Sequence, residues 1–185
     1  MADGHFLCRP TRPALHNEKA PLLVYNEEIE NILNDAAVKM LGYLASQYPT
    51  LNFEEKSLVK QRPIEAAIAF YNAVLAERNG DKFFPRSAEN GKSDAFRHFV
   101  WAGLMTRDLD QPTTQKFLGA HELNPRQPLD EKTMDTFNNE RGIQAAEQLL
   151  KSGSFKDDDF FNYAVKEIEE GRLKILNYEE RQNKY

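Results

Sequence analysis

Residues Ser93–Arg107 read SDAFRHFVWAGLMTR, and this stretch decides the fold class. Phe96, Val100 and Leu104 recur at steps of four, the spacing of side chains along one side of an α-helix. Stripes of the same period recur through most of the chain, with no internal repeat and no low-complexity segment. We therefore predict a single all-α domain, a compact bundle of about six helices.

The expected organisation is an irregular N-terminal arm at residues 1–25 followed by a helical domain at 26–185. Helices are expected at about 26–48, 63–78, 93–107, 112–122, 131–151 and 157–170, with a short helix at 51–61. Asn79-Gly80 is a strong helix stop, so residues 81–90 are predicted to form a connecting loop. Leu173–Leu176 is predicted to be a short strand or an extended tail packed on the bundle.

The composition argues against several classes of protein. The 185 residues carry 24 Lys and Arg against 29 Asp and Glu, a net charge of -5, whereas nonspecific binding to nucleic acid needs clustered basic residues. Gly80 and Gly91 form no phosphate-binding loop, so no nucleotide cofactor is expected. Cys8 is the only cysteine, which rules out an internal disulfide and a cysteine-based zinc site.

The sequence also gives an expectation about where in the cell the protein is located. No segment approaches the roughly 18 consecutive apolar residues of a membrane span. The first ten residues lack the basic start and apolar stretch of a secretory signal. The default expectation is therefore a cytoplasmic protein, and export by a dedicated secretion system that needs no cleavable signal is the alternative.

Residues 90–142 hold the candidate site. Asp94, His98 and Trp101 share one face of the helix at 93–107, and Arg97 adjoins that face. A helix surface exposed to water normally carries Lys and Glu there, but here the polar face is flanked by apolar surface. This pattern predicts that the polar side chains point into a site within the bundle.

Two further motifs supply polar residues to the same region. Asp135, Asn138, Asn139 and Gly142 fall at positions n, n+3, n+4 and n+7 of one helix and form a stripe. Asn is a poor helix former, and Gly costs about 1 kcal/mol relative to Ala within a helix. Gly142 therefore indicates close approach of another backbone or of a ligand. His121-Glu122 ends the preceding helix, where both side chains can point at the same pocket.

One interpretation is a centre for a divalent metal ion, zinc or a similar ion. The expected ligands are His98, His121, Asp135 and, as a ligand or as a group that orients one, Asp94. Glu122 would act as the acid or base that activates water. The side chains expected to bind a polar or anionic substrate group are Arg97, Trp101, Asn138 and Asn139.

Two other interpretations stay open. Without a metal, Glu122 with a pKa raised by burial would be a general acid and Asp135 a base or stabiliser, as in a glycosidase. Alternatively, Arg97 pairs with Asp94, Glu122 or Asp135 in a buried structural network, and the protein is a binding or adaptor protein. Trp101 is more typical of a core residue than of a substrate platform.

The chain resembles an uncharacterised bacterial domain family on three motifs and a tail. The motifs are Asn-Gly-Lys-x-Asp-Ala-Phe-Arg-His-x-x-Trp at 90–101, Ala-His-Glu at 120–122 and Met-Asp-x-x-Asn-Asn-x-x-Gly at 134–142, with Gly-Arg-Leu-Lys-Ile at 171–175. Similar domains occur at the C-terminal ends of large secreted or toxin-like proteins and as small standalone proteins. The resemblance implies a bacterial origin and marks the same polar residues, but it implies no reaction.

The leading hypothesis from the sequence is a small helical hydrolase, metal-dependent, of toxin, effector or envelope-acting type. Its substrates would be phosphoester, glycosidic or amide bonds. A cognate inhibitor or a secretion partner would accompany such a protein.

Overall fold

The structure is a computed structural model that describes residues 51–176 apart from 86, 88 and 126. Its helices are α2 (Phe53–Gln61), α3 (Pro63–Phe83), α4 (Lys92–Asp108), α5 (Gln111–His121), α6 (Leu129–Ser152) and α7 (Asp157–Glu169). The described residues contain no strand, so the predicted all-α fold is confirmed. The arm expected at 1–25 and the helix expected at 26–48 lie outside the described residues.

Local sequence signals set several helix ends. Asn52 caps α2 in a capping box with Glu55, and Pro63 occupies the first turn of α3. Asp110 caps α5 by accepting a hydrogen bond from the Thr113 backbone N–H at 2.6 Å. In this part of the chain, no helix combines the length and the apolar character needed to cross a lipid bilayer.

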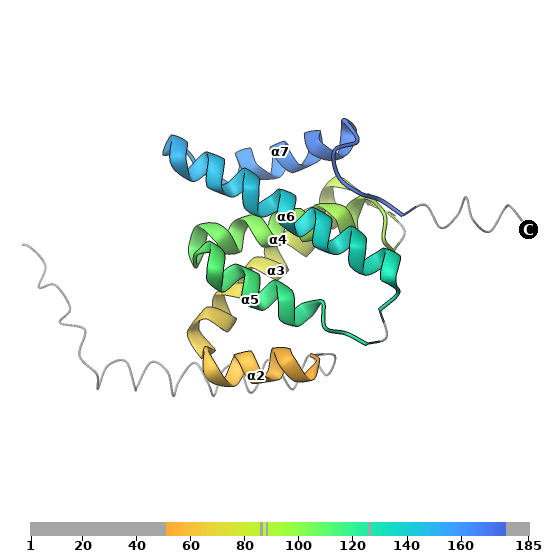
Figure 1. Cartoon of the computed structure of the whole chain (residues 1–185). Helices are drawn as coiled ribbons and strands as arrows, with labels where there is room; N and C mark the ends of the chain where they lie inside the picture. The colour runs from red at the N-terminus through yellow and green to blue at the C-terminus, as the bar shows by residue number, and fades with distance from the viewer. Residues whose placement is uncertain (1–50, 86, 88, 126, 177–185) are drawn as a thin grey trace, which may run out of the picture.

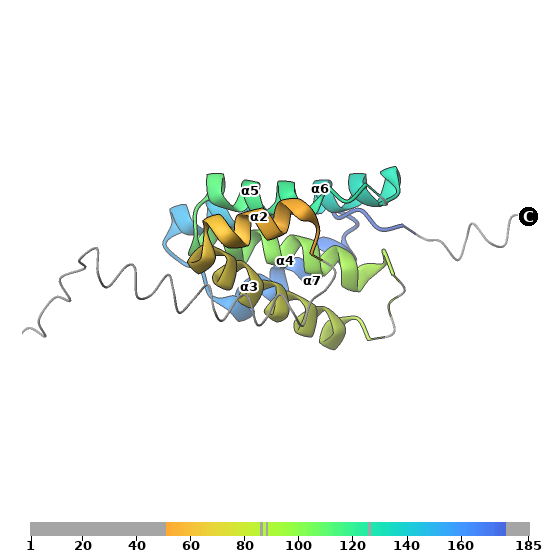
Figure 2. The same cartoon turned by 90° about the horizontal axis from the view of Figure 1, so that it is seen from below.

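Helix α4 lies at the centre of the bundle and contacts α3, α5, α6 and α7 (Figures 1 and 2). Its fully buried side chains include Phe96, Phe99 and Leu104, and Phe99 stacks on Phe160 of α7 with ring centroids 5.3 Å apart. Because α4 packs against so many elements, its sequence has few positions that face water.

Two glycines allow α4 and α6 to cross closely. A Cβ atom added to Gly142 would lie 2.1 Å from the carbonyl oxygen of Phe99, and one added to Gly103 would lie 3.2 Å from the carbonyl oxygen of Gly142. The Cβ at Gly103 would also lie 2.1 Å from the Phe160 ring of α7, so this glycine serves two helix contacts. The predicted use of Gly142 for close approach of another backbone is confirmed. This crossing brings the polar residues of α4 and α6 face to face.

The predicted end of the helix at 63–78 is wrong. Helix α3 continues through Asn79-Gly80 to Phe83, which shortens the loop expected at 81–90. An added Cβ at Gly80 would meet the Ser93 hydroxyl oxygen at 2.9 Å, so this glycine permits close packing on the start of α4. Phe83 packs on Phe96 with centroids 5.6 Å apart, and this tertiary contact favours continuation of the helix.

The segment after α7 is an extended tail and not a strand. Asn138 of α6 holds it at Lys174, whose backbone N–H and carbonyl oxygen lie 2.9 and 3.0 Å from the side-chain amide. The Leu176 N–H donates to the carbonyl oxygen of Asn90 at 2.9 Å. The tail thereby closes one side of the bundle next to the loop that leads into α4.

Candidate metal centre

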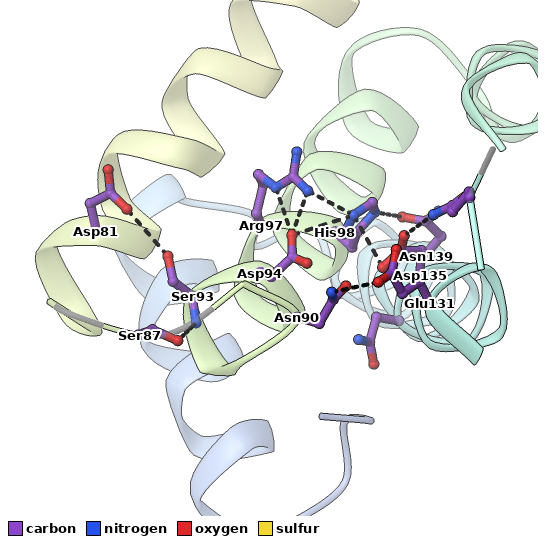
Figure 3. A network of polar contacts seen from close by, with 12 residues as sticks. Asp81, Ser87, Asn90, Ser93, Asp94, Arg97, His98, Glu131, Asp135 and Asn139 are labelled. Carbon is purple, nitrogen blue, oxygen red and sulfur yellow. Dashed lines mark hydrogen bonds and ion pairs between the residues drawn. The ribbon is translucent and has the colours of Figure 1, made fainter. Parts of the chain in front are cut away.

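Asp94 and His98 of α4 meet Asp135 of α6 where the two helices cross (Figure 3). One ligand atom from each residue lies within 4.8 Å of the other two. His98 Nε2 is 3.6 Å from Asp94 Oδ1 and 3.3 Å from Asp135 Oδ1. Two carboxylates and one imidazole form a ligand set that suits a divalent first-row metal ion.

A chain of hydrogen bonds orients His98. Its Nδ1 lies 3.3 Å from Asn139 Oδ1, and Asn139 Nδ2 donates to Glu122 Oε1 at 3.2 Å. Because the amide oxygen of Asn139 only accepts, His98 carries its proton on Nδ1 and has its lone pair on Nε2. The same arrangement fixes imidazole ligands in metal sites, where the other ring nitrogen donates to a fixed acceptor.

Arg97 is a cation in direct contact with this cluster. Its guanidinium bonds to Asp94 Oδ1 through Nε, at 3.0 Å, and through Nη2. The same Nη2 lies 3.1 Å from His98 Nε2. A guanidinium only donates, so this contact independently places the lone pair of His98 on Nε2.

Burial dominates the electrostatics of the cluster. Burial, together with the neighbouring carboxylates of Asp94 and Glu122, raises the pKa of Asp135 to about 7. Burial, followed by the charges of Arg97 and His121, holds the pKa of His98 well below its usual range, so the imidazole is neutral. Burial also raises the pKa of Glu122. Among the described residues, the positive charge near the cluster is therefore too small to keep all its carboxylates ionised.

The carboxylate of Asp135 has an unsatisfied oxygen atom inside the cluster. Its side chain is only 6% exposed. Oδ2 accepts a hydrogen bond from Gln127 at 2.6 Å, whereas Oδ1, the atom that faces His98, is buried without a hydrogen-bond partner. A buried acceptor without a partner carries a cost of about 1–3 kcal/mol. A cation or a proton between Asp135 Oδ1 and the other two ligands would remove that cost.

The cluster opens into a pocket of about 440 Å³ between α3, α4, α6, the end of α5 and the loops beside them. Its described lining is rich in carboxylic acids, namely Glu77, Asp81, Glu89, Asp94, Glu131 and Asp135. Arg97 is the one Lys or Arg among the described lining residues, and it is already paired with Asp94. The pocket therefore favours cations.

His121 lines the pocket but lies outside the ligand group. Its ring centroid is 6.0 Å from that of His98, and its Nδ1 is 2.8 Å from Glu55 Oε1 of α2. Trp101 packs edge-on against His121, and its indole N–H donates to the Ala69 carbonyl at 2.9 Å. Trp101 thus joins the core to the site wall, as the sequence indicated for a core residue.

The structure separates the predicted residues into two groups. Asp94, His98, Asp135, Asn139 and Arg97 come together. Asn138 does not join them, since both polar ends of its side chain bind the Lys174 backbone. Glu122 lies behind Asn139 and is not among the described residues that line the pocket.

Sequence reasoning missed three residues that contact the site or its lining. Glu55 orients His121, and Gln127 binds Asp135. Asn90 donates to Glu131 at 3.0 Å on the pocket wall. Asn90 lay within the family-like motif, but Glu55 and Gln127 carry no local signal because their partners lie in other elements of the chain.

Comparison with known proteins agrees with an uncharacterised domain. No curated protein and no solved structure matched the chain. A family model described as a domain of unknown function, DUF6973, matches residues 56–172, which is more than half of the chain and spans α4, α5 and α6. The chain belongs to the DUF6973 family.

Proposed function

We propose that the domain is a metal-dependent hydrolase whose divalent ion is held by Asp94, His98 and Asp135. The observation that carries the proposal is the buried, unpartnered Asp135 Oδ1, 3.3 Å from the ring nitrogen of His98 that bears the lone pair. Two electron-pair donors that face each other repel unless a proton or a cation lies between them, and the third ligand, Asp94, favours a cation. Three protein ligands also leave coordination positions open, as catalytic sites require.

The chain's own residues have distinct roles in this proposal. When bound, a divalent ion supplies Lewis-acid activation of water and of the substrate. Asn139 fixes the tautomer and orientation of His98, and Glu122 holds Asn139. We assign the acid/base role to His121, which lines the pocket and is oriented by Glu55 in the manner of a carboxylate–histidine pair. Glu122, the residue expected from the sequence, acts through Asn139 instead.

The acidic lining bears on the substrate. Arg97 was expected to bind an anionic group, but its charge is balanced by Asp94, and the other charged side chains of the described lining are carboxylic acids. Such a wall repels phosphate groups. We therefore favour an uncharged or amine-bearing substrate, with an amide or glycosidic bond rather than a phosphoester. A toxin-like or envelope-acting role, with a cognate inhibitor or a secretion partner, follows from the family resemblance and is part of the same proposal.

The Arg97 contacts favour a second candidate, a metal-free binding or adaptor protein. In that case the guanidinium is the permanent counter-ion of Asp94, and the cluster is a buried network that specifies packing. The raised pKa values of Asp135 and Glu122 also suit a metal-free acid and base, although Glu122 is separated from the pocket by Asn139.

Metal content distinguishes the two candidates. Tag-free protein purified without chelator is analysed for metals, and the chelator-treated protein is titrated with Zn²⁺ by calorimetry. We expect close to one site in the wild type, loss of the site in Asp135→Asn with an unchanged circular dichroism spectrum, and retention in Asp158→Asn, an exposed control on α7. His121→Ala should keep the metal. Absence of bound metal in the wild type, with Asp135→Asn more stable than the wild type, would support the adaptor.

A further inference from the structure

We propose that Arg97 is a built-in competitor of the metal ion, so that metal binding must displace its guanidinium from His98. The inference rests on the proposed metal centre and adds a residue that sets its affinity and its choice of ion. Arg97 Nη2 contacts both Asp94 Oδ1 and His98 Nε2, two of the three ligands (Figure 3).

His98 Nε2 cannot accept a hydrogen bond from Arg97 and bind a metal ion at the same time. A neutral imidazole has one N–H and one lone pair. His98 uses its N–H on Asn139 and faces Arg97 with Nε2 at 3.1 Å. The single lone pair on Nε2 accepts from the guanidinium or binds a metal ion, but not both. The carboxylates do not share this restriction, because each oxygen has two lone pairs.

The arginine has room to move. Its side chain is 39% exposed at the pocket, whereas that of His98 is 1% exposed. Glu77 and Asp81 of α3 line the same pocket and offer carboxylates to a guanidinium that has left His98. The acidic lining thus has a use that does not depend on the substrate, since it stabilises the displaced arginine near the opening.

Competition at a nitrogen lone pair selects the class of ion. Zn²⁺, Co²⁺ and Ni²⁺ bind imidazole nitrogen well and gain enough to displace the guanidinium. Mg²⁺ and Ca²⁺ prefer oxygen ligands and gain little from His98. We therefore expect the centre to discriminate against Mg²⁺, although the pocket is rich in carboxylates.

The test compares Zn²⁺ affinity in Arg97→Gln and Arg62→Gln. Arg62 is a matched control, because it pairs with Glu65 at 3.1 Å, also with two residues between the partners, and is similarly half-exposed. Removal of one charge-assisted hydrogen bond that metal must break predicts Zn²⁺ affinity about tenfold higher in Arg97→Gln. Arg62→Gln should match the wild type. Equal or weaker binding in Arg97→Gln overturns the inference.

A second measurement uses the wild-type protein and does not depend on how the variant folds. The side-chain Nε–H resonance of Arg97 in ¹⁵N-labelled protein, assigned with Arg97→Lys, should move with the midpoint of the Zn²⁺ titration and stay in place with Mg²⁺. If Zn²⁺ saturates the protein while this resonance is unchanged, Arg97 is no competitor. If neither the wild type nor Arg97→Gln binds Zn²⁺, it is the metal centre itself that fails.

Discussion

Glu55 Oε1 lies 2.8 Å from His121 Nδ1 across a separation of 66 residues, and Oε2 of the same carboxylate accepts the Asn52 backbone N–H at 2.7 Å. One side chain therefore caps helix α2 and orients the histidine at the end of α5. The Asn52 side chain adds a bond of 2.6 Å to the Ala120 carbonyl oxygen. Helix α2 contributes no fully buried residue. These polar contacts therefore add to the packing of its partly buried Leu58 and Val59 in holding the helix on the bundle.

Glu55→Ala should weaken this junction. Loss of half of the capping box and of the bond to His121 predicts a decrease of about 1–2 kcal/mol in the free energy of unfolding. Urea denaturation measures the change. Glu54→Ala is the control, because Glu54 lies in the same first turn outside the capping box and should cost much less. Equal costs for the two variants would show that the carboxylate–histidine contact contributes nothing.

Replacement of glycine by alanine is expected to have opposite effects on stability at positions 142 and 119. Gly142→Ala places a methyl group 2.1 Å from the Phe99 carbonyl oxygen, whereas a Cβ at Gly119 meets nothing within 4 Å. We expect Gly142→Ala to cost more than about 3 kcal/mol or to prevent folding, because backbone must move. Gly119→Ala should stabilise the protein by about 0.5–1 kcal/mol through helix propensity. Thermal unfolding distinguishes the expected loss of stability in Gly142→Ala from the expected gain in Gly119→Ala.

Periodicity was sufficient to predict the helices that the structure describes, but not the helix ends that depend on tertiary contacts. The stripe in Phe96, Val100 and Leu104 describes the buried side of α4 because it results from burial itself. Asn79-Gly80 has the local features of a helix stop. Helix α3 nevertheless continues through it, because Gly80 permits close packing on Ser93 and Phe83 packs on Phe96, and both partners lie beyond the reach of any local rule.

The candidate site was predictable only in part. Asp94, His98 and Asp135 stand out because buried ionisable groups in helices are unusual. Asn138 and Asn139 look equivalent in sequence, but successive residues on a helix point about 100° apart. One therefore binds the tail and the other binds His98. Glu55 and Gln127 come from separate elements, and only the packed structure brings them to the site.

The carboxylate of Glu167 on α7 is expected to make the stability of the fold depend on pH. Its buried carboxylate binds Arg141 Nη2 at 2.7 Å and Arg172 Nε at 2.7 Å. Burial acts to raise the pKa of Glu167, but the hydrogen bonds from Arg172 and Arg141 prevail and hold it below its usual range. A lowered folded-state pKa stabilises the protein above the unfolded value of 4.5, and this contribution is lost as the pH falls through the folded value.

Glu167→Gln should therefore cost about 2 kcal/mol at neutral pH, the magnitude of hydrogen bonds to charged groups. The difference from the wild type should shrink as the pH falls below 4.5. Urea denaturation between pH 7 and pH 3 measures it, with Glu169→Gln on the exposed side of α7 as the control. A difference that does not change with pH would mean that the ionised carboxylate is not the stabilising species.

The adjacent asparagines on α6 are expected to have different roles: Asn138 contributes to stability, and Asn139 contributes to metal affinity. Asn138→Ala removes two bonds to the Lys174 backbone and should lower the free energy of unfolding by about 1–3 kcal/mol while Zn²⁺ affinity stays the same. Asn139→Ala removes the acceptor that fixes the tautomer of His98, and loss of such a partner typically lowers metal affinity by about 10–100-fold. Zn²⁺ calorimetry and denaturation of both variants test the pair together. If Asn138→Ala weakens the metal as much as Asn139→Ala does, the tail rather than the His98 hydrogen bond controls the centre.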